Sequence, residues 1–102
     1  MSQQQTDQPM FRVLLLNDDH TPMEFVVHVL ECFFGKDRDT AAQIMQSAHY
    51  DGLAECGIYG YDLAKAKVDQ VLNFAKEHHH PLQCVLERNS STQAGSPNSV
   101  AT

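Results

Sequence analysis

The chain has 102 residues, of which 42% are hydrophobic, and 13 acidic against 7 basic residues give it a formal net charge of −6. This length and composition fit one globular domain with a small core, whereas the acidic balance argues against a nucleic acid partner, because phosphate contacts need a basic surface. No apolar stretch approaches the roughly 18 residues of a membrane-spanning helix, and the polar first ten residues lack the pattern of a secretory signal, so no membrane partner is expected.

Apolar periodicity predicts three strands and three helices between two polar tails. The expected order is a strand at 11–16, a helix from Thr21 to Gly35, a helix from about Asp37 to Gly52, a strand at 53–59 with a bulge at Gly57, a helix from about Tyr61 to Pro81, and a strand at 82–86. This order predicts an α+β fold in which three helices cover one face of a three-stranded, mostly antiparallel sheet. The folded domain is expected over 10–88, between disordered tails at 1–9 and 89–102.

The start of the first helix has strong sequence signals. Thr21 is a suitable N-cap, Pro22 fits the first helical position, and Glu24 follows the cap by three residues. The preceding residues Asn17, Asp18 and Asp19 therefore lie in a short turn between a strand and a helix.

This polar turn has three interpretations. Asn and Asp are common turn residues that bond their own backbone, their oxygens also suit a divalent cation, and an organic ammonium needs fewer ligands than a metal does. His49, near the end of the second helix, is either favoured there by the helix dipole or is a neutral acceptor that faces a cleft. A metal-assisted hydrolase using Asp18, Asp19 and His49 is thus an alternative, although two adjacent acids are a weak metal signal.

The remaining reactive residues are interpreted as structural. Three scattered cysteines, an odd number, favour a reducing, cytoplasmic compartment, and the apolar neighbours of Cys32, Cys56 and Cys84 predict buried thiols. His78-His79-His80 does not have the usual spacing of a zinc site and is expected to be a solvated helix end. A Cys56–His49 pair has no motif around it. Phosphate-loop and nucleophile motifs are absent, so the sequence predicts neither a cofactor nor a metal.

One continuous motif goes beyond these general patterns. The run from Leu14 to Val27, with Asn17-Asp18-Asp19-His20-Thr21-Pro22-Met23-Glu24-Phe25 at its centre, closely resembles the opening of the ClpS family. Further matches are Phe33-Phe34, Gln43-Ile44-Met45 with Ala48-His49, Cys56-Gly57-Ile58-Tyr59, Lys67-Val68 and His80-Pro81-Leu82, so the resemblance covers about residues 11–88.

The resemblance implies a non-enzymatic adaptor for protein degradation. ClpS proteins bind substrates with a free N-terminal Leu, Phe, Tyr or Trp, known as N-degrons, and deliver them to a ClpA-type AAA+ unfoldase and its peptidase. By resemblance, the α-ammonium is held by Asn17, Asp18 and His49. The implied cavity for the first side chain is lined by Leu15, Asp19, Thr21, Met23, Val26, Met45, Ala48 and Leu82, with Met23 as a gate against β-branched residues.

The resemblance also places the unfoldase-docking surface, at Asp62, Lys65 and Lys67. Several positions depart from the family pattern: Ala48 stands where valine is common, which predicts a larger pocket, Gly60-Tyr61-Asp62 replaces a more usual Thr-x-Glu helix start, and Lys65 stands where an acid is frequent. A general peptide-binding module that does not recognise the N-terminus is a further alternative, in which the first residue of a peptide would not matter.

Overall fold

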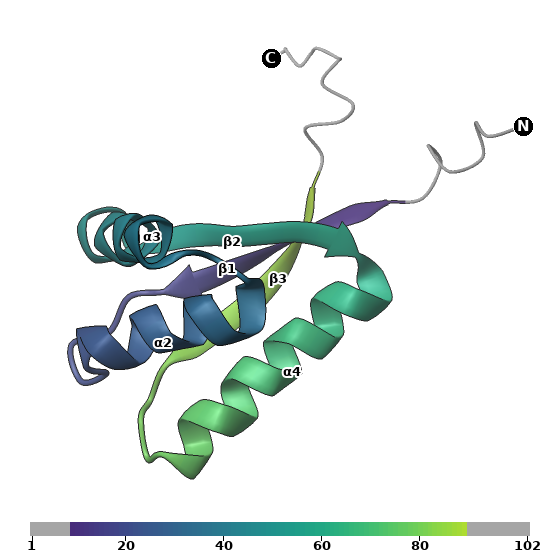
Figure 1. Ribbon diagram of the computed structural model, residues 1–102. Helices are drawn as coiled ribbons and strands as arrows, with labels where there is room; N and C mark the ends of the chain where they lie inside the picture. Colours follow the sequence, from purple (N-terminus) through teal and green to yellow (C-terminus); the bar gives the residue numbers. More distant parts are fainter. Residues whose placement is uncertain (1–8, 90–102) are drawn as a thin grey trace, which may run out of the picture.

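The computed structural model describes residues 9–89 and contains the three strands and three helices in the expected order (Figure 1). They are β1 (Met10–Leu16), α2 (Met23–Phe34), α3 (Arg38–Asp51), β2 (Leu53–Gly60), α4 (Tyr61–Glu77) and β3 (Gln83–Asn89). Of the two expected tails, residues 1–8 and 90–102 lie outside the described part, and β3 extends as far as Asn89.

The sheet has the order β2-β1-β3, and both neighbours run antiparallel to β1. The end of β1 therefore lies beside the start of each neighbour, with Leu16 paired to Leu53 on one side and to Gln83 on the other. This topology brings the polar turn after β1, the end of α3 and the residue before β3 to one edge of the sheet. The predicted bulge is confirmed, because the register shifts between Val13 and Leu14, opposite Gly57.

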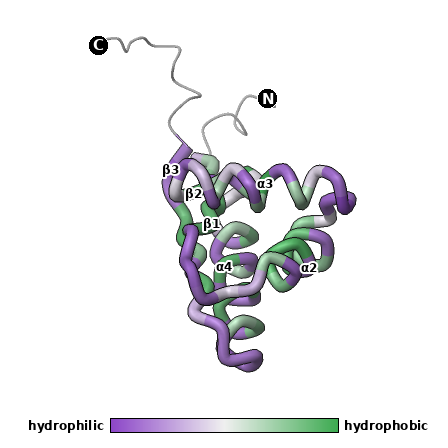
Figure 2. The backbone as a smooth tube through the Cα atoms, turned by 90° about the vertical axis from the view of Figure 1, so that its left-hand side faces the viewer, coloured by the Kyte–Doolittle hydropathy of each residue, from purple (hydrophilic) through white to green (hydrophobic). Residues whose placement is uncertain are grey.

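Helices α2 and α4 pack on one face of the sheet, and α3 packs on β2 and α2 (Figure 1). The core is fully apolar and includes Val13 and Leu15 of β1, Val29 and Leu30 of α2, and Val71 of α4. Figure 2 shows that the apolar stretches concentrate in β1 and α2, the two elements that flank the polar turn. The predicted fold class is confirmed.

Three of the helix boundaries follow the chemistry that the sequence predicts. Asp37 caps α3 through a hydrogen bond from the Thr40 amide to its Oδ1, at 2.8 Å. Gly35 and Gly52 end α2 and α3 with φ values of 65° and 91°, which glycine adopts without strain.

The expected N-cap at Thr21 is wrong. Helix α2 begins at Met23, and Pro22, with an extended ψ of 144°, occupies the capping position without a side-chain hydrogen bond. The Thr21 hydroxyl instead donates backward to Asp18 Oδ2 at 2.7 Å. Helix α2 begins one residue later than the sequence pattern predicts, so Thr21 lies outside its capping position.

The prediction of three buried thiols is correct for Cys56 and Cys84 and wrong for Cys32, which is exposed. Helix α2 turns Val29 and Leu30 toward the core, and Cys32 lies on its opposite side. The Cys32 Sγ approaches His28 Nε2 to 3.5 Å. Among the helices of residues 9–89, none is long and apolar enough to cross a membrane.

Candidate functional site

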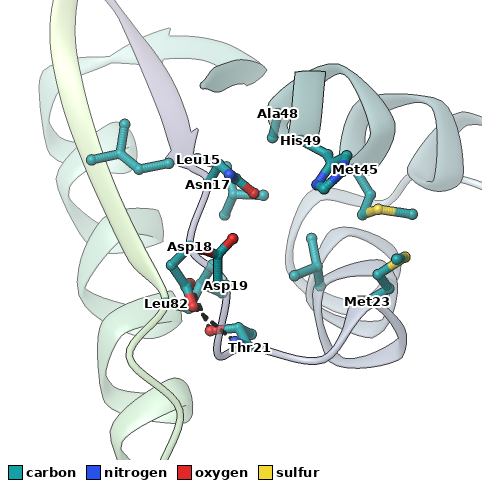
Figure 3. Close-up of a pocket in the computed structure, with 12 residues that line it drawn as sticks. Leu15, Asn17, Asp18, Asp19, Thr21, Met23, Met45, Ala48, His49 and Leu82 are labelled. Atoms are coloured by element: carbon teal, nitrogen blue, oxygen red, sulfur yellow. Dashed lines mark hydrogen bonds between the residues drawn. The ribbon is translucent and has the colours of Figure 1, made fainter. Parts of the chain in front are cut away.

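A cavity of about 150 Å³ opens at the edge of the sheet where β1 ends (Figure 3). Every residue expected to hold the amine or to line the side-chain pocket borders this one cavity, together with Leu16, which the sequence analysis did not name. The lining residues are Leu15, Leu16, Asn17, Asp18, Asp19, Thr21, Met23, Val26, Met45, Ala48, His49 and Leu82. The fold thus gathers residues that lie up to 67 positions apart in the chain, from 15 to 82.

The polar part of the lining comes from the turn after β1 and from the last turn of α3. A hydrogen bond of 3.0 Å from the Asn17 amide to the Gly52 carbonyl ties these two segments together. As a result, the Asn17 side chain and the His49 imidazole border the same cavity, and both residues are exposed to solvent. An amide oxygen and an unprotonated imidazole nitrogen are both hydrogen-bond acceptors, so the rim can receive the N–H groups of a ligand.

The Asp18 carboxylate is held by three hydrogen bonds from its own turn. Its Oδ1 accepts from the amides of His20 and Thr21, at 2.8 and 2.7 Å, and its Oδ2 accepts from the Thr21 hydroxyl at 2.7 Å. Partial burial opposes the ionisation of Asp18, but these hydrogen bonds outweigh it and lower the pKa of the carboxyl. Asp18 is therefore a fixed negative charge at neutral pH, with only part of its accepting capacity left for a ligand.

The neighbouring acid, Asp19, has a different environment. It is exposed and borders the cavity. Within residues 9–89, no hydrogen bond or ion pair engages its carboxylate. Its oxygens are therefore free to face a cationic ligand, directly or through water.

The apolar part of the lining is buried, whereas Met23 at its rim is exposed. Leu15, Ala48 and Leu82 are buried and come from β1, α3 and the segment before β3. Met23, by contrast, is 60% exposed at the first position of α2. An unbranched methionine can adapt its conformation, so Met23 can adjust to a ligand at the mouth of the buried apolar wall.

Cys56 and the histidine cluster at 78–80 lie outside the cavity lining. Cys56 lies in the core and not in the cavity lining, and burial raises the pKa of its thiol to about 12. His78 and His80 lie against the Phe25 ring, with ring centroids 5.5 and 4.5 Å away. No group of three or more His, Cys, Asp or Glu side chains within residues 9–89 is arranged to hold a metal ion.

The residues expected to dock the unfoldase lie on α4 and outside the cavity. Asp62 and Lys65 are exposed, and Lys65 pairs with Asp69 at 3.2 Å. Lys67 is partly buried, and its Nζ donates to the Phe33 carbonyl at 2.6 Å. Lys67 therefore also satisfies a carbonyl at the end of α2, a structural contact that the sequence did not reveal.

Comparisons with known proteins agree on one family. Residues 6–85 match the family described as ATP-dependent Clp protease adaptor protein ClpS. ClpS 1 of Agrobacterium fabrum is 58% identical over 79 residues, which are 78% of this chain and 68% of that protein. ClpS of Nitrosospira multiformis is 58% identical over 81 residues, which are 79% of each chain.

A solved structure gives the same result. The fold matches Agrobacterium tumefaciens ClpS2 bound to L-phenylalaninamide with a TM-score of 0.79 and 35% identity, over 80% of this chain and 99% of that one. The resemblance seen in the motif around Asn17 is therefore confirmed. The chain belongs to the ClpS family of Clp protease adaptors.

Proposed function

We propose that this protein binds the free N-terminus of proteins that begin with Leu, Phe, Tyr or Trp and delivers them to a ClpA-type AAA+ unfoldase for degradation. The observation that carries the proposal is the composition of the cavity. Polar acceptors from the turn and from α3 share it with a buried apolar wall. A free N-terminus with a bulky first residue presents the matching pair, a cationic amine beside an apolar side chain.

The polar half suits an α-ammonium, which has three N–H donors. Asn17 and His49 accept directly, and Asp18 supplies fixed negative charge and an acceptor through water. Hydrogen bonds to a charged group contribute about 1.5–3 kcal/mol each. Asp19, with its unengaged carboxylate, adds to the negative field at the same place.

The apolar half suits one large side chain. A cavity of about 150 Å³ is similar in size to engineered protein cavities that take benzene, and burial of a Leu or Phe side chain contributes about 1.5–3 kcal/mol. Because association itself costs about 4–15 kcal/mol, both halves are needed for tight binding. The relative bound to L-phenylalaninamide supports this division, since that ligand carries a free amine and a phenyl ring.

In this proposal the protein is an adaptor without catalytic residues, cofactor or metal. Delivery would use α4, which carries Asp62, Lys65 and Lys67 outside the cavity lining. The separation matters because a substrate can then stay bound while the unfoldase docks.

A peptide panel that varies only the first residue tests the proposal, with binding read by fluorescence anisotropy. Peptides that start with Leu, Phe, Tyr or Trp should bind, and those that start with Ala, Val or Ser should not. Equal affinity across the panel would instead indicate a general peptide-binding module. Metal-dependent turnover of the peptides, abolished by a chelator, would indicate the hydrolase.

Matched variants locate the site. Asn17→Ala and His49→Ala should each weaken binding of the Phe peptide by at least about tenfold, the value of one charged hydrogen bond. Asn73→Ala and His28→Ala remove the same residue types from exposed positions on α4 and α2 outside the cavity, and they should leave affinity unchanged. Equal effects in both pairs would mean that the peptide binds elsewhere.

A further inference from the structure

The chain contains the same local pattern, Asp-x-x-Thr, at two places. In both, an aspartate Oδ1 accepts from the amide of the threonine three residues later, at 2.7 Å for Asp18 and Thr21 and at 2.8 Å for Asp37 and Thr40. The second pattern starts α3, with Asp37 as its N-cap. The first starts no helix, because Pro22 follows Thr21 with an extended backbone and α2 begins only at Met23.

The first pattern is therefore a helix-capping arrangement without a helix to cap. A residue before proline is disfavoured in the helical region, so Thr21 cannot continue the turn into α2. What the arrangement does achieve is to immobilise a carboxylate, since the Thr21 hydroxyl adds a third hydrogen bond to Asp18. The last side-chain torsion of an aspartate normally covers a broad range of angles. In Asp18, hydrogen bonds hold both carboxylate oxygens in place.

The immobilised group lies in the wall of the cavity. Asp18 and Thr21 both line it, and Figure 3 shows the hydrogen bonds between them at its lower side. A side chain that is ordered before the ligand arrives avoids the entropy cost of ordering it on binding. The bond between these two side chains therefore bears on ligand affinity and not only on the shape of the turn.

We infer that Thr21 is a positioning residue for the bound amine: its hydroxyl fixes the Asp18 carboxylate in the orientation that the ammonium requires. This inference rests on the proposed function. Thr21 acts through Asp18 and needs no contact of its own with the amine. The side chain thus has a role in recognition beyond that of a cavity wall.

The test compares two probes that differ only in the amine. One is a peptide that starts with Phe, and the other replaces Phe by 3-phenylpropionyl, which keeps the ring and lacks the amine. Thr21→Val keeps the shape of the side chain and removes the hydroxyl. We expect it to weaken the Phe peptide by about threefold to tenfold, the range that one net hydrogen bond supports, and to leave the affinity of the amine-free probe unchanged.

Two further variants separate positioning from structure. Thr21→Ser retains a hydroxyl and should restore the affinity of the Phe peptide to within about twofold. Thr40→Val removes the corresponding hydroxyl beside Asp37, outside the cavity, and should change neither affinity.

Each contrary result is informative. The inference is overturned if Thr21→Val leaves the Phe peptide unaffected, if it weakens both probes equally, or if Thr21→Ser fails to restore binding in a folded protein. Failure of the proposed function looks different, because the wild-type protein itself would then bind both probes equally or bind neither.

Discussion

Substitution of Ala48 by valine should change which first residue the protein prefers. Ala48 is 4% exposed, lies in the last turns of α3 and borders the cavity. Valine adds two carbons to this wall, and its β-branched side chain is restricted to essentially one rotamer in a helix. The added carbons therefore take a fixed part of a cavity of only about 150 Å³.

The magnitude depends on the size of the ligand's first side chain. A tryptophan that fills the cavity would be overpacked, which costs about 1–3 kcal/mol, or about 5-fold to 150-fold in affinity. A leucine leaves space that the new carbons can fill, and each CH₂ removed from water contributes at most about 0.8 kcal/mol, or about fourfold. The ratio of leucine affinity to tryptophan affinity should therefore rise by about tenfold or more in Ala48→Val.

Fluorescence anisotropy with peptides identical beyond the first residue measures this ratio directly. Ala42→Val is the matched control, because Ala42 is half-buried on the same helix, lies outside the cavity, and carries the same cost of a β-branched residue in a helix. An unchanged ratio in folded Ala48→Val would refute the assignment of the first side chain to this cavity. An equal change of the ratio in Ala42→Val would show that any valine in α3 alters the preference, and would also contradict the assignment to the cavity wall.

Three further predictions concern the folded state. A thiol reagent should modify Cys32 rapidly and the other two cysteines only on unfolding, because burial raises the pKa of each of those thiols to about 12; rapid modification of three thiols, counted by mass spectrometry, would contradict the structure. Folding lowers the pKa of Asp18 below its ordinary value. The Asp18 carboxylate therefore stabilises the folded state when the pH is above the ordinary pKa, and this stabilisation is lost as the pH falls through the lowered pKa. Urea unfolding should accordingly show that Asp18→Asn is less stable than wild type at about pH 6, and that the gap closes by about pH 2; a gap that persists in acid would argue against the charged hydrogen bonds. Lys67→Met should lower the free energy of unfolding by about 1–3 kcal/mol, because it removes the partly buried bond to the Phe33 carbonyl, whereas Lys65→Met, which breaks an exposed ion pair, should cost less than about 0.5 kcal/mol; equal losses would refute the difference in burial.

The secondary structure was predictable where the chemistry is local. Asp37 and the glycines at 35 and 52 end or begin helices through contacts within a few residues, and the sequence pattern identified all three. Thr21 was misassigned because the extended backbone at Pro22 moves the start of α2 to Met23, which the sequence pattern did not reveal. Cys32 was misassigned because an apolar neighbourhood in sequence does not reveal which side of α2 faces the core.

The cavity is a different kind of feature. Met45, Ala48 and Leu82 have the spacing of core residues, and nothing in their periodicity separates a pocket wall from a packed interior. Only the family resemblance grouped them in advance, and the antiparallel order β2-β1-β3 explains why they meet. Leu16 was missed, although its position directly before Asn17 and at the end of β1 was an available signal.

The central claim is that the cavity recognises a cationic chain end together with the side chain beside it. Acetylation of the N-terminus of a peptide that starts with Phe tests it most directly, because the acetyl group removes the charge and two N–H donors while the phenyl ring is unchanged. In a competition experiment at neutral pH, acetylation should weaken binding by about 100-fold or more, the loss expected from two charged hydrogen bonds. Equal affinity of the acetylated and free peptides would contradict the account.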